Sequence, residues 1–336
     1  MNRATMAKLA ARSRSLPLFE LLGRRPALVV LVYHRVMPHE QHPYDRALIE
    51  ATPEQFDEQM AMLKKRHAVA DPEELLSLVE NPKSVRSLRV AITFDDGYRD
   101  NYRFAFPILK SHGLAAAFYL PTQYIGTRTL PWWDQVANAI RRCTKDEIDL
   151  RYPKAFKVRV NRDDPEVAIQ SVLRAYGRDP SAVLARFLEE VERACELELV
   201  EESEEPQFMS WDEAAEMNRA GMAIESHTRS HQVLANLTSE EQRGECFESR
   251  ALLRARGLSA ISLAYPVGHK TAFTPETVAL AREAGYRYAV SNYGGINLPE
   301  TMNRFDVRRL GMDAAVSATQ LRLRFALTGL ARQAPW

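Results

Sequence analysis

The sequence predicts an α/β fold, a distorted (β/α) barrel of seven or eight units with a helical insertion on its active-site rim. Apolar runs of strand length alternate with amphipathic helical segments along most of the chain, which is typical of parallel α/β architectures. Unusual polar residues directly follow four of the apolar runs. Because the carboxyl ends of barrel strands share one face, these residues are expected to meet there.

Each of the four polar groups has a common structural explanation when taken alone. An Asp-Asp-Gly after a strand is usually a turn, and a pair of histidines four residues apart usually binds nothing. A single histidine is usually a hydrogen-bonded core residue, and Pro-Val-Gly alone is a loop. Their joint occurrence at strand ends favours a functional site instead. The groups are His34 after the run 28–33, Asp95 and Asp96 after 90–94, His227 and His231 after 222–225, and Tyr265-Pro266-Val267-Gly268 after 261–264.

Capping signals locate the helices between these strands. Thr52-Pro53-Glu54-Gln55 and Ser210-Trp211-Asp212-Glu213 both read as capping boxes, in which side chains at the first turn satisfy free backbone N–H groups. Further helices are expected over 101–111 and 239–256 and from Thr274 to Gly285, with strands over 115–120 and 286–290.

Residues 127–206 interrupt this rhythm and are predicted to form the helical insertion. They contain Trp132 and Trp133 and a run of acidic residues at 201–205. The two indoles could stack on sugar rings or could attach the insertion to the barrel. The predicted organisation is a basic helical segment over 1–25, a barrel over 26–126 and 207–312, the insertion over 127–206, and a C-terminal amphipathic helix over 313–336.

Composition limits the classes of partner and indicates where in the cell the protein is expected. The 336-residue chain has a formal net charge of +1, so no nucleic-acid partner is expected. Three widely spaced cysteines exclude a disulfide framework and suit a reducing compartment. With neither a signal peptide nor an apolar stretch long enough to span a membrane, a cytoplasmic location is expected. Residues 1–25 could contact an anionic membrane face peripherally, or pack across the lower end of the barrel.

The motifs resemble those of the polysaccharide deacetylases of carbohydrate esterase family 4, the NodB-homology family. Thr93-Phe94-Asp95-Asp96-Gly97 matches the first family motif at all five positions, and His227-Thr228 with His231 matches the second. Residues 264–268 match the third motif, Arg-x-Pro-Tyr-Gly, only in part. The resemblance covers roughly residues 27–125 and 206–312.

The resemblance implies roles for the matching residues. Asp96, His227 and His231 would bind a divalent metal, for which two imidazoles and a carboxylate suit Zn²⁺, with Co²⁺ or Ni²⁺ as alternatives. Asp95 occupies the position of the catalytic base. The backbone N–H of Val267 would stabilise the oxyanion. The neighbouring Tyr265 and Pro266, together with Trp132 and Trp133, are expected to contact the substrate.

Two departures from the family pattern require substitutes. Ala264 stands where the family has the arginine that pairs with the base, and Arg309 is the predicted replacement. The late motif that carries the acid histidine is absent. In a branch of the family that makes biofilm polysaccharides, the motif order is permuted and this histidine lies near the N-terminus in a Tyr-His context similar to Tyr33-His34. His34 is therefore the predicted acid.

The resulting expectation is a metal-dependent hydrolase that removes N-acetyl groups from N-acetylhexosamine units of a polysaccharide or a lipid-linked glycan, most plausibly in exopolysaccharide assembly. Two alternatives remain open. One is an O-deacetylase with the same site, and the other is a barrel that binds a sugar or a metal without catalysis. Retention of Asp95 favours an enzyme, because metal binding does not need a base and hydrolysis does.

Overall fold

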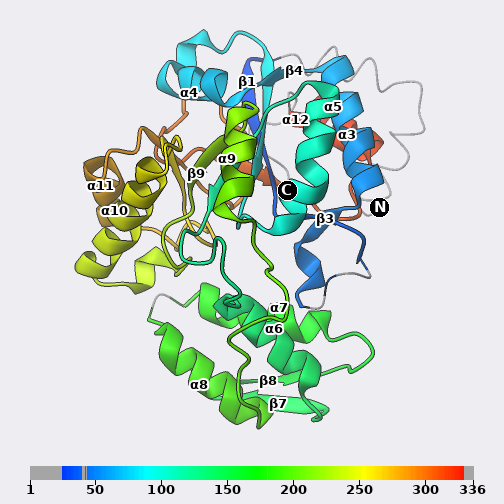
Figure 1. The fold of residues 1–336 in the computed structure, drawn as a ribbon, viewed down its shortest axis with the longest axis vertical. Helices are drawn as coiled ribbons and strands as arrows, with labels where there is room; N and C mark the ends of the chain where they lie inside the picture. The colour runs from blue at the N-terminus through cyan, green and yellow to red at the C-terminus, as the bar shows by residue number, and fades with distance from the viewer. Residues whose placement is uncertain (1–24, 40–41, 43, 180, 329–336) are drawn as a thin grey trace.

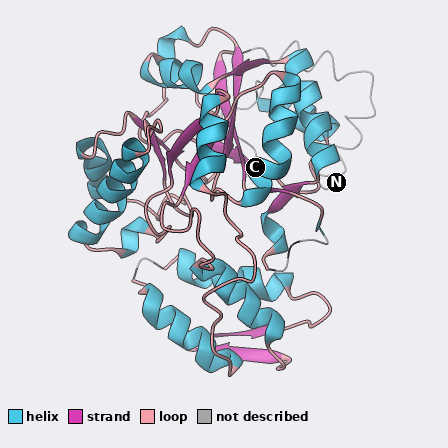
Figure 2. Cartoon of the chain, in the orientation of Figure 1, coloured by secondary structure: helices cyan, strands magenta, loops and turns pink. Residues whose placement is uncertain are grey.

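A parallel sheet surrounded by helices forms the centre of the computed structural model, which describes residues 25–39, 42, 44–179 and 181–328 (Figures 1 and 2). Its strands follow the order β11-β10-β9-β6-β5-β1-β12, and β4 shares with β6 the edge of β5 opposite β1. The strands are β1 (Ala27–Tyr33), β4 (Ala68–Ala70), β5 (Leu88–Phe94), β6 (Ala117–Leu120), β9 (Ala223–Ser226), β10 (Ser262–Ala264), β11 (Tyr288–Val290) and β12 (Arg309–Gly311).

The sheet closes into a barrel. β12 pairs with β1, and a parallel bridge between Val290 and Val307 joins β11 to the segment that leads into β12. Within the described residues, seven strands therefore form the ring and β4 lies beside it. The predicted barrel of seven or eight units is confirmed.

Helices cover the outside of this barrel, and both predicted capping boxes are present, with Thr52 accepting from Gln55 N and Ser210 from Glu213 N. The helix expected over 101–111 begins with a π-helical turn, Asn101–Ala105. The helices are α3 (Pro53–Arg66), α4 (Pro72–Glu80), α5 (Phe106–His112), α9 (Trp211–Arg219), α10 (Ser239–Ala255), α11 (Pro275–Glu283) and α12 (Ala318–Thr328).

Alternation along β1 separates two parts of the core. Leu28 and Val30 belong to a buried cluster with residues of other strands and of α4, whereas Val29 and Leu31 pack with the residues of the outer helices. Every residue of β1 is buried, as expected for a strand covered on both faces. In Figure 1, α4 lies at one end of the barrel and the segment between β6 and β9 at the other.

The segment between β6 and β9 contains more than the predicted helices. It holds an antiparallel hairpin as well, in which Ile148 and Leu150 are buried and their neighbours Glu147 and Asp149 are exposed. The four-residue alternation is too short to distinguish from helical segments by pattern alone. The elements are α6 (Trp132–Arg142), β7 (Glu147–Leu150), β8 (Phe156–Arg159), α7 (Glu166–Gly177) and α8 (Leu184–Cys195).

The two ends of the chain are described to different extents. The basic segment predicted over 1–25 lies, apart from Arg25, outside the described residues. Near the other end, α12 packs against α3, with Leu321 and Phe325 buried one turn apart. In the part of the chain that the structure describes, none of the helices combines the length and the apolar character that crossing a membrane requires.

Candidate active site

The two aspartates stand on a tight turn at the end of β5. Asp96 has a φ of 69° and the Gly97 N–H donates to the Asp95 carbonyl oxygen at 2.9 Å. Gly97 also has a positive φ, and a Cβ there would overlap Leu120 Cδ2. A non-glycine residue with positive φ stores strain that is common at functional sites. The turn gives the adjacent carboxylates different partners.

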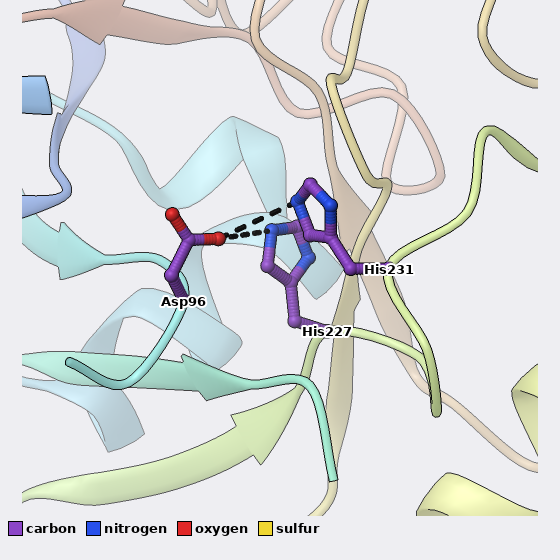
Figure 3. A group of neighbouring side chains, drawn as sticks. All are labelled: Asp96, His227 and His231. Atoms are coloured by element: carbon purple, nitrogen blue, oxygen red, sulfur yellow. Dashed lines mark ion pairs between the residues drawn. The ribbon is translucent and has the colours of Figure 1, made fainter. Parts of the chain in front are cut away.

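Asp96, His227 and His231 come together as a buried group (Figure 3). Asp96 Oδ1 lies 3.6 Å from His227 Nε2 and 3.4 Å from His231 Nε2. One potential ligand atom from each residue lies within 4.8 Å of the others. His231 itself has a φ of 57°, so its backbone is held in a sparsely populated conformation where its ring reaches the group.

The atoms of this group that make no hydrogen bond could coordinate a metal cation. The Nδ1 of His227 contacts the Ala264 carbonyl oxygen at 2.8 Å, which fixes the tautomer with a free lone pair on Nε2. Asp96 Oδ1 is buried and accepts no hydrogen bond within the described part of the chain. A bound cation would satisfy this buried carboxylate oxygen, and two imidazoles and a carboxylate are typical metal ligands.

Burial also sets the protonation states of these ligands. It lowers the pKa of His227 to about 4 and that of His231 well below its ordinary value, so both imidazoles are neutral near pH 7 and can donate a lone pair. Burial raises the pKa of Asp96 to about 7. A cation in the group would favour the ionised form of this carboxylate.

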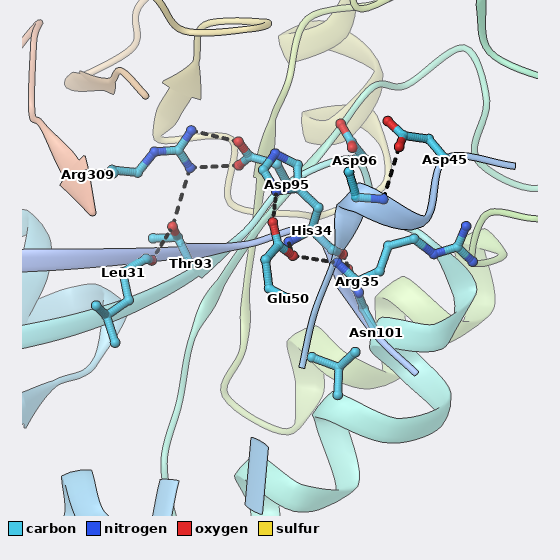
Figure 4. Close-up of polar contacts among 12 residues, drawn as sticks. Leu31, His34, Arg35, Asp45, Glu50, Thr93, Asp95, Asp96, Asn101 and Arg309 are labelled. Atoms are coloured by element: carbon cyan, nitrogen blue, oxygen red, sulfur yellow. Dashed lines mark hydrogen bonds and ion pairs between the residues drawn. The ribbon is translucent and has the colours of Figure 1, made fainter. Parts of the chain in front are cut away.

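Asp95 pairs with Arg309 (Figure 4), and its Oδ2 also lies 3.8 Å from Nε2 of His227. The guanidinium binds both carboxylate oxygens, with Nη1 2.7 Å from Oδ1 and Nη2 2.6 Å from Oδ2, and its Nε donates to the Ser291 carbonyl oxygen at 3.0 Å. Burial alone would raise the pKa of Asp95, but the Arg309 charge and hydrogen bonds hold it below its usual range. Arg309 thus occupies the place predicted for the missing motif-three arginine.

His34 lies across the same site and is oriented by Glu50 (Figure 4). Its Nδ1 lies 2.7 Å from Glu50 Oε1, while Glu50 Oε2 accepts from the backbone N–H groups of His34 and Arg35. Burial alone would lower the pKa of His34, but the Glu50 charge and hydrogen bond raise it to about 10. Sequence reasoning missed Glu50, although a single carboxylate within the otherwise apolar stretch 47–51 was a usable signal.

These residues surround one pocket with a volume of about 280 Å³. Val267 lines it with a φ of 61°, and the Gly268 N–H donates to the Pro266 carbonyl oxygen at 2.6 Å. Within the described residues the Val267 N–H has no hydrogen-bond acceptor, so it can donate to an oxyanion. The lining side chains include His34, Asp95, Asp96, Trp132, Trp133, His227, His231 and Val267 from the predicted set.

The two tryptophans join the segment between β6 and β9 to a member of the histidine pair. Trp132 Nε1 donates to the His231 carbonyl oxygen at 3.1 Å, and the Trp133 ring centroid lies 4.3 Å from that of His231. Trp133 Nε1 also donates to the Tyr98 hydroxyl at 2.7 Å, and this hydroxyl donates to Asp134 at 3.1 Å. The indoles therefore attach α6 to the barrel and line the pocket as well.

Tyr265 and Pro266 are the predicted substrate-contacting residues that do not line the pocket. The Tyr265 ring stacks on Phe273 with centroids 4.1 Å apart, and its hydroxyl donates to the Phe305 carbonyl oxygen at 3.0 Å. Pro266 is buried and does not line the pocket either. The expectation that these two side chains contact the substrate is corrected, because only Val267 of this motif reaches the pocket.

The candidate site stands at the carboxyl ends of barrel strands, and the family match shows that the protein is a hydrolase of the deacetylase class. The polysaccharide deacetylase family model matches residues 83–152 and 182–289. The chain belongs to this family, and the resemblance stated from its motifs is confirmed.

Individual relatives agree with this assignment. The chain is 22% identical over 274 residues to YxkH of Bacillus subtilis (strain 168), a provisionally assigned polysaccharide deacetylase, covering 81% of this chain and 67% of the relative. Two solved structures share the fold with TM-scores of 0.56 and 18% identity. They are the Streptococcus pyogenes deacetylase PplD in complex with acetate, covering 88% of this chain and 96% of the other, and IcaB from Ammonifex degensii, covering 91% and 98%.

Proposed function

We propose that this deacetylase is metal-dependent and removes N-acetyl groups from N-acetylhexosamine units of a polysaccharide or lipid-linked glycan. The observation that supports the proposal is that the two adjacent aspartates have different environments. Asp96 is orphaned beside two neutral imidazoles, whereas Asp95 is kept ionised by Arg309 at the same pocket. A metal ligand and a separate base are what metal-assisted hydrolysis requires.

Asp96, His227 and His231 would hold the divalent ion; this mixed nitrogen and oxygen ligand set suits Zn²⁺, with Co²⁺ or Ni²⁺ as alternatives. When bound, the ion supplies a lowered pKa for water and polarisation of the acetyl carbonyl. Three protein ligands would leave positions open for these molecules, as in catalytic rather than structural sites.

The chain's own groups would carry the proton transfers. Asp95 accepts the proton of the attacking water on a carboxylate oxygen, and its pairing with Arg309 keeps it ionised and oriented. The Val267 N–H donates to the oxyanion, a role that needs no particular side chain. His34, held by Glu50 and protonated near neutral pH, gives a proton to the departing amine.

An acetyl ester would meet the same groups, so O-deacetylation remains an alternative. A barrel that only binds a sugar or a metal is the second alternative. The buried pairing of Arg309 with Asp95 favours an enzyme, because metal binding does not need this second carboxylate and hydrolysis needs a base.

The test is acetate release from N-acetylglucosamine oligomers and from their O-acetylated counterparts, with purified protein before and after chelation. Activity that falls on chelation and returns with Zn²⁺, Co²⁺ or Ni²⁺ supports the proposal. Acetate release from the O-acetylated substrates alone would show that the protein is an O-deacetylase instead. No release from either substrate class by the metal-loaded protein would favour the binding barrel.

The proposal extends to location. The three described cysteines are free thiols, which suits the cytoplasm. The basic residues of 1–25 would support contact with anionic lipids. Sedimentation with vesicles that do or do not contain phosphatidylserine tests this contact, and equal sedimentation in both cases would contradict it.

A further inference from the structure

One face of α7 forms a wall of the active-site pocket. Gln170, Leu173, Arg174, Gly177 and Arg178 all line it, at the three- and four-residue spacing that places side chains on one side of a helix. Gly177 is buried, and a Cβ there would lie 3.5 Å from Cγ1 of Val267. The helix thus packs directly against Val267, which also lines the pocket.

This wall carries two cationic side chains that the protein does not neutralise. Arg174 and Arg178 are exposed, and neither guanidinium has a hydrogen bond or ion pair within the described residues. Near the start of the same helix, by contrast, Glu166 pairs with Arg141. The charge of Arg178 is felt nearby, because it adds to burial in lowering the pKa of His269, which also lines the pocket.

The carboxylates that face the pocket are already engaged elsewhere. Asp45 accepts from the Ala47 N–H at 3.0 Å and from Gln170 Nε2 at 2.7 Å. Asp95 is held by Arg309, and Asp96 belongs to the candidate metal group. The two arginines of α7 are therefore left as donors for an anion that the protein itself does not supply.

We propose that Arg174 and Arg178 bind a negatively charged group of the glycan, a carboxylate or a phosphate, beside the N-acetylhexosamine whose amide is cleaved. The inference rests on the proposed deacetylation at the same pocket. Guanidinium groups offer forked donors that match both anions. Both arginines line the same pocket as the candidate metal group, so an anionic group held by them would lie within this pocket. The preferred substrate is accordingly an anionic glycan, and a neutral N-acetylglucosamine polymer is a poorer one.

The experiment compares wild type with Arg174→Gln, Arg178→Gln and the double variant on three substrates. These are a neutral N-acetylglucosamine tetramer, a hyaluronan tetrasaccharide that carries uronate carboxylates, and N-acetylglucosamine 1-phosphate. Arg219→Gln is the matched control, since Arg219 is another exposed arginine at the end of a helix, α9, but does not line the pocket.

Each single variant is expected to lose about 3- to 10-fold in kcat/KM on the anionic substrate, the range for hydrogen bonds to a partly exposed charge, and to change less than about twofold on the neutral one. The double variant should lose more, and added salt should weaken the wild-type preference. The anionic substrate that loses activity identifies the group as carboxylate or phosphate.

Calorimetric binding of the two anionic sugars provides a readout that does not need turnover. Loss of binding in the double variant with retention in Arg219→Gln supports the inference, even if no substrate releases acetate and the proposed function fails. Equal losses on neutral and anionic substrates, or unchanged binding in the double variant, would overturn it and assign the two arginines to a solvated surface. Far-UV circular dichroism and metal content confirm that the variants are folded.

Discussion

Replacing Arg309 by Met tests whether the buried ion pair with Asp95 is a working part of the site. The guanidinium is 0% exposed and its Asp95 partner 3% exposed, and the two groups share two hydrogen bonds of 2.7 and 2.6 Å. Removing one member of such a pair leaves an uncompensated charge in the interior. The free energy of unfolding should therefore fall by about 3–5 kcal/mol.

A second change separates the charge from the packing. If the penalty comes from the unpaired Asp95 carboxylate, adding Asp95→Asn to Arg309→Met should recover about 1–3 kcal/mol, because the remaining amide is neutral. Arg243 is a matched control on the surface, since it also forms two 2.7 Å bonds with one carboxylate, Glu283. Replacing it by Met should leave the unfolding curve unchanged within error, because exposed pairs are screened by water.

The assay is urea unfolding followed by far-UV circular dichroism, with chelator present so that metal binding does not add to the measured stability. Arg309→Met should also lose deacetylase activity after metal is restored, since the base is no longer held ionised and oriented. The reasoning is refuted if Arg309→Met lowers the free energy of unfolding by less than about 1 kcal/mol. It is also refuted if adding Asp95→Asn lowers that free energy further, as two independent substitutions would, instead of restoring part of it.

Four further outcomes follow from the site. Asp95→Asn should retain the metal but lose turnover by about 10² to 10⁴, the usual contribution of a general base, and near-normal turnover would remove Asp95 from that role. His227→Ala should lose bound metal in elemental analysis, and full occupancy would exclude it as a ligand. His34→Ala should suppress N-deacetylation and spare an activated acetyl ester, whose leaving group needs no proton; equal loss of both activities would indicate a structural histidine. Trp132→Phe should weaken metal affinity about tenfold, measured by competition with a chromophoric chelator, because it removes the hydrogen bond to the backbone carbonyl of His231. The control Trp211→Phe should leave the affinity unchanged, and equal affinities in the two variants would limit Trp132 to packing.

The barrel and the main candidate residues were predictable because they depend on short-range signals. Strand ends such as Phe94 are marked by an apolar run and a turn, and the parallel arrangement then brings successive carboxyl ends to one face. The prediction that Asp95, Asp96 and His227 lie close together therefore did not depend on side-chain contacts. Arg309 was also predicted as the partner of Asp95, and the structure brings it there because β12 pairs with β1, whose other neighbour is β5.

Residues that depend on long-range packing were not predictable in the same way. Glu50 reaches His34 through β3 (Ile49–Ala51), a strand of only three residues that pairs outside the barrel sheet. The hairpin β7–β8 has too few alternating positions to give a clear strand pattern. The orientation of Tyr265 depends on the cluster it joins, and no local pattern indicates whether a side chain at a strand end faces the pocket or the core.

The third motif shows why a partial match can preserve a site. Its side chains differ from the family pattern at Ala264 and Val267, yet the roles at both positions belong to the backbone: the carbonyl of Ala264 contacts His227, and the N–H of Val267 is the proposed oxyanion donor. Backbone groups survive substitution as long as the turn is kept. Gly268 supports the turn, because a Cβ there would approach the Asn292 backbone nitrogen to 2.6 Å. The one side-chain function that the motif loses, pairing with the base, is the one that Arg309 supplies from β12.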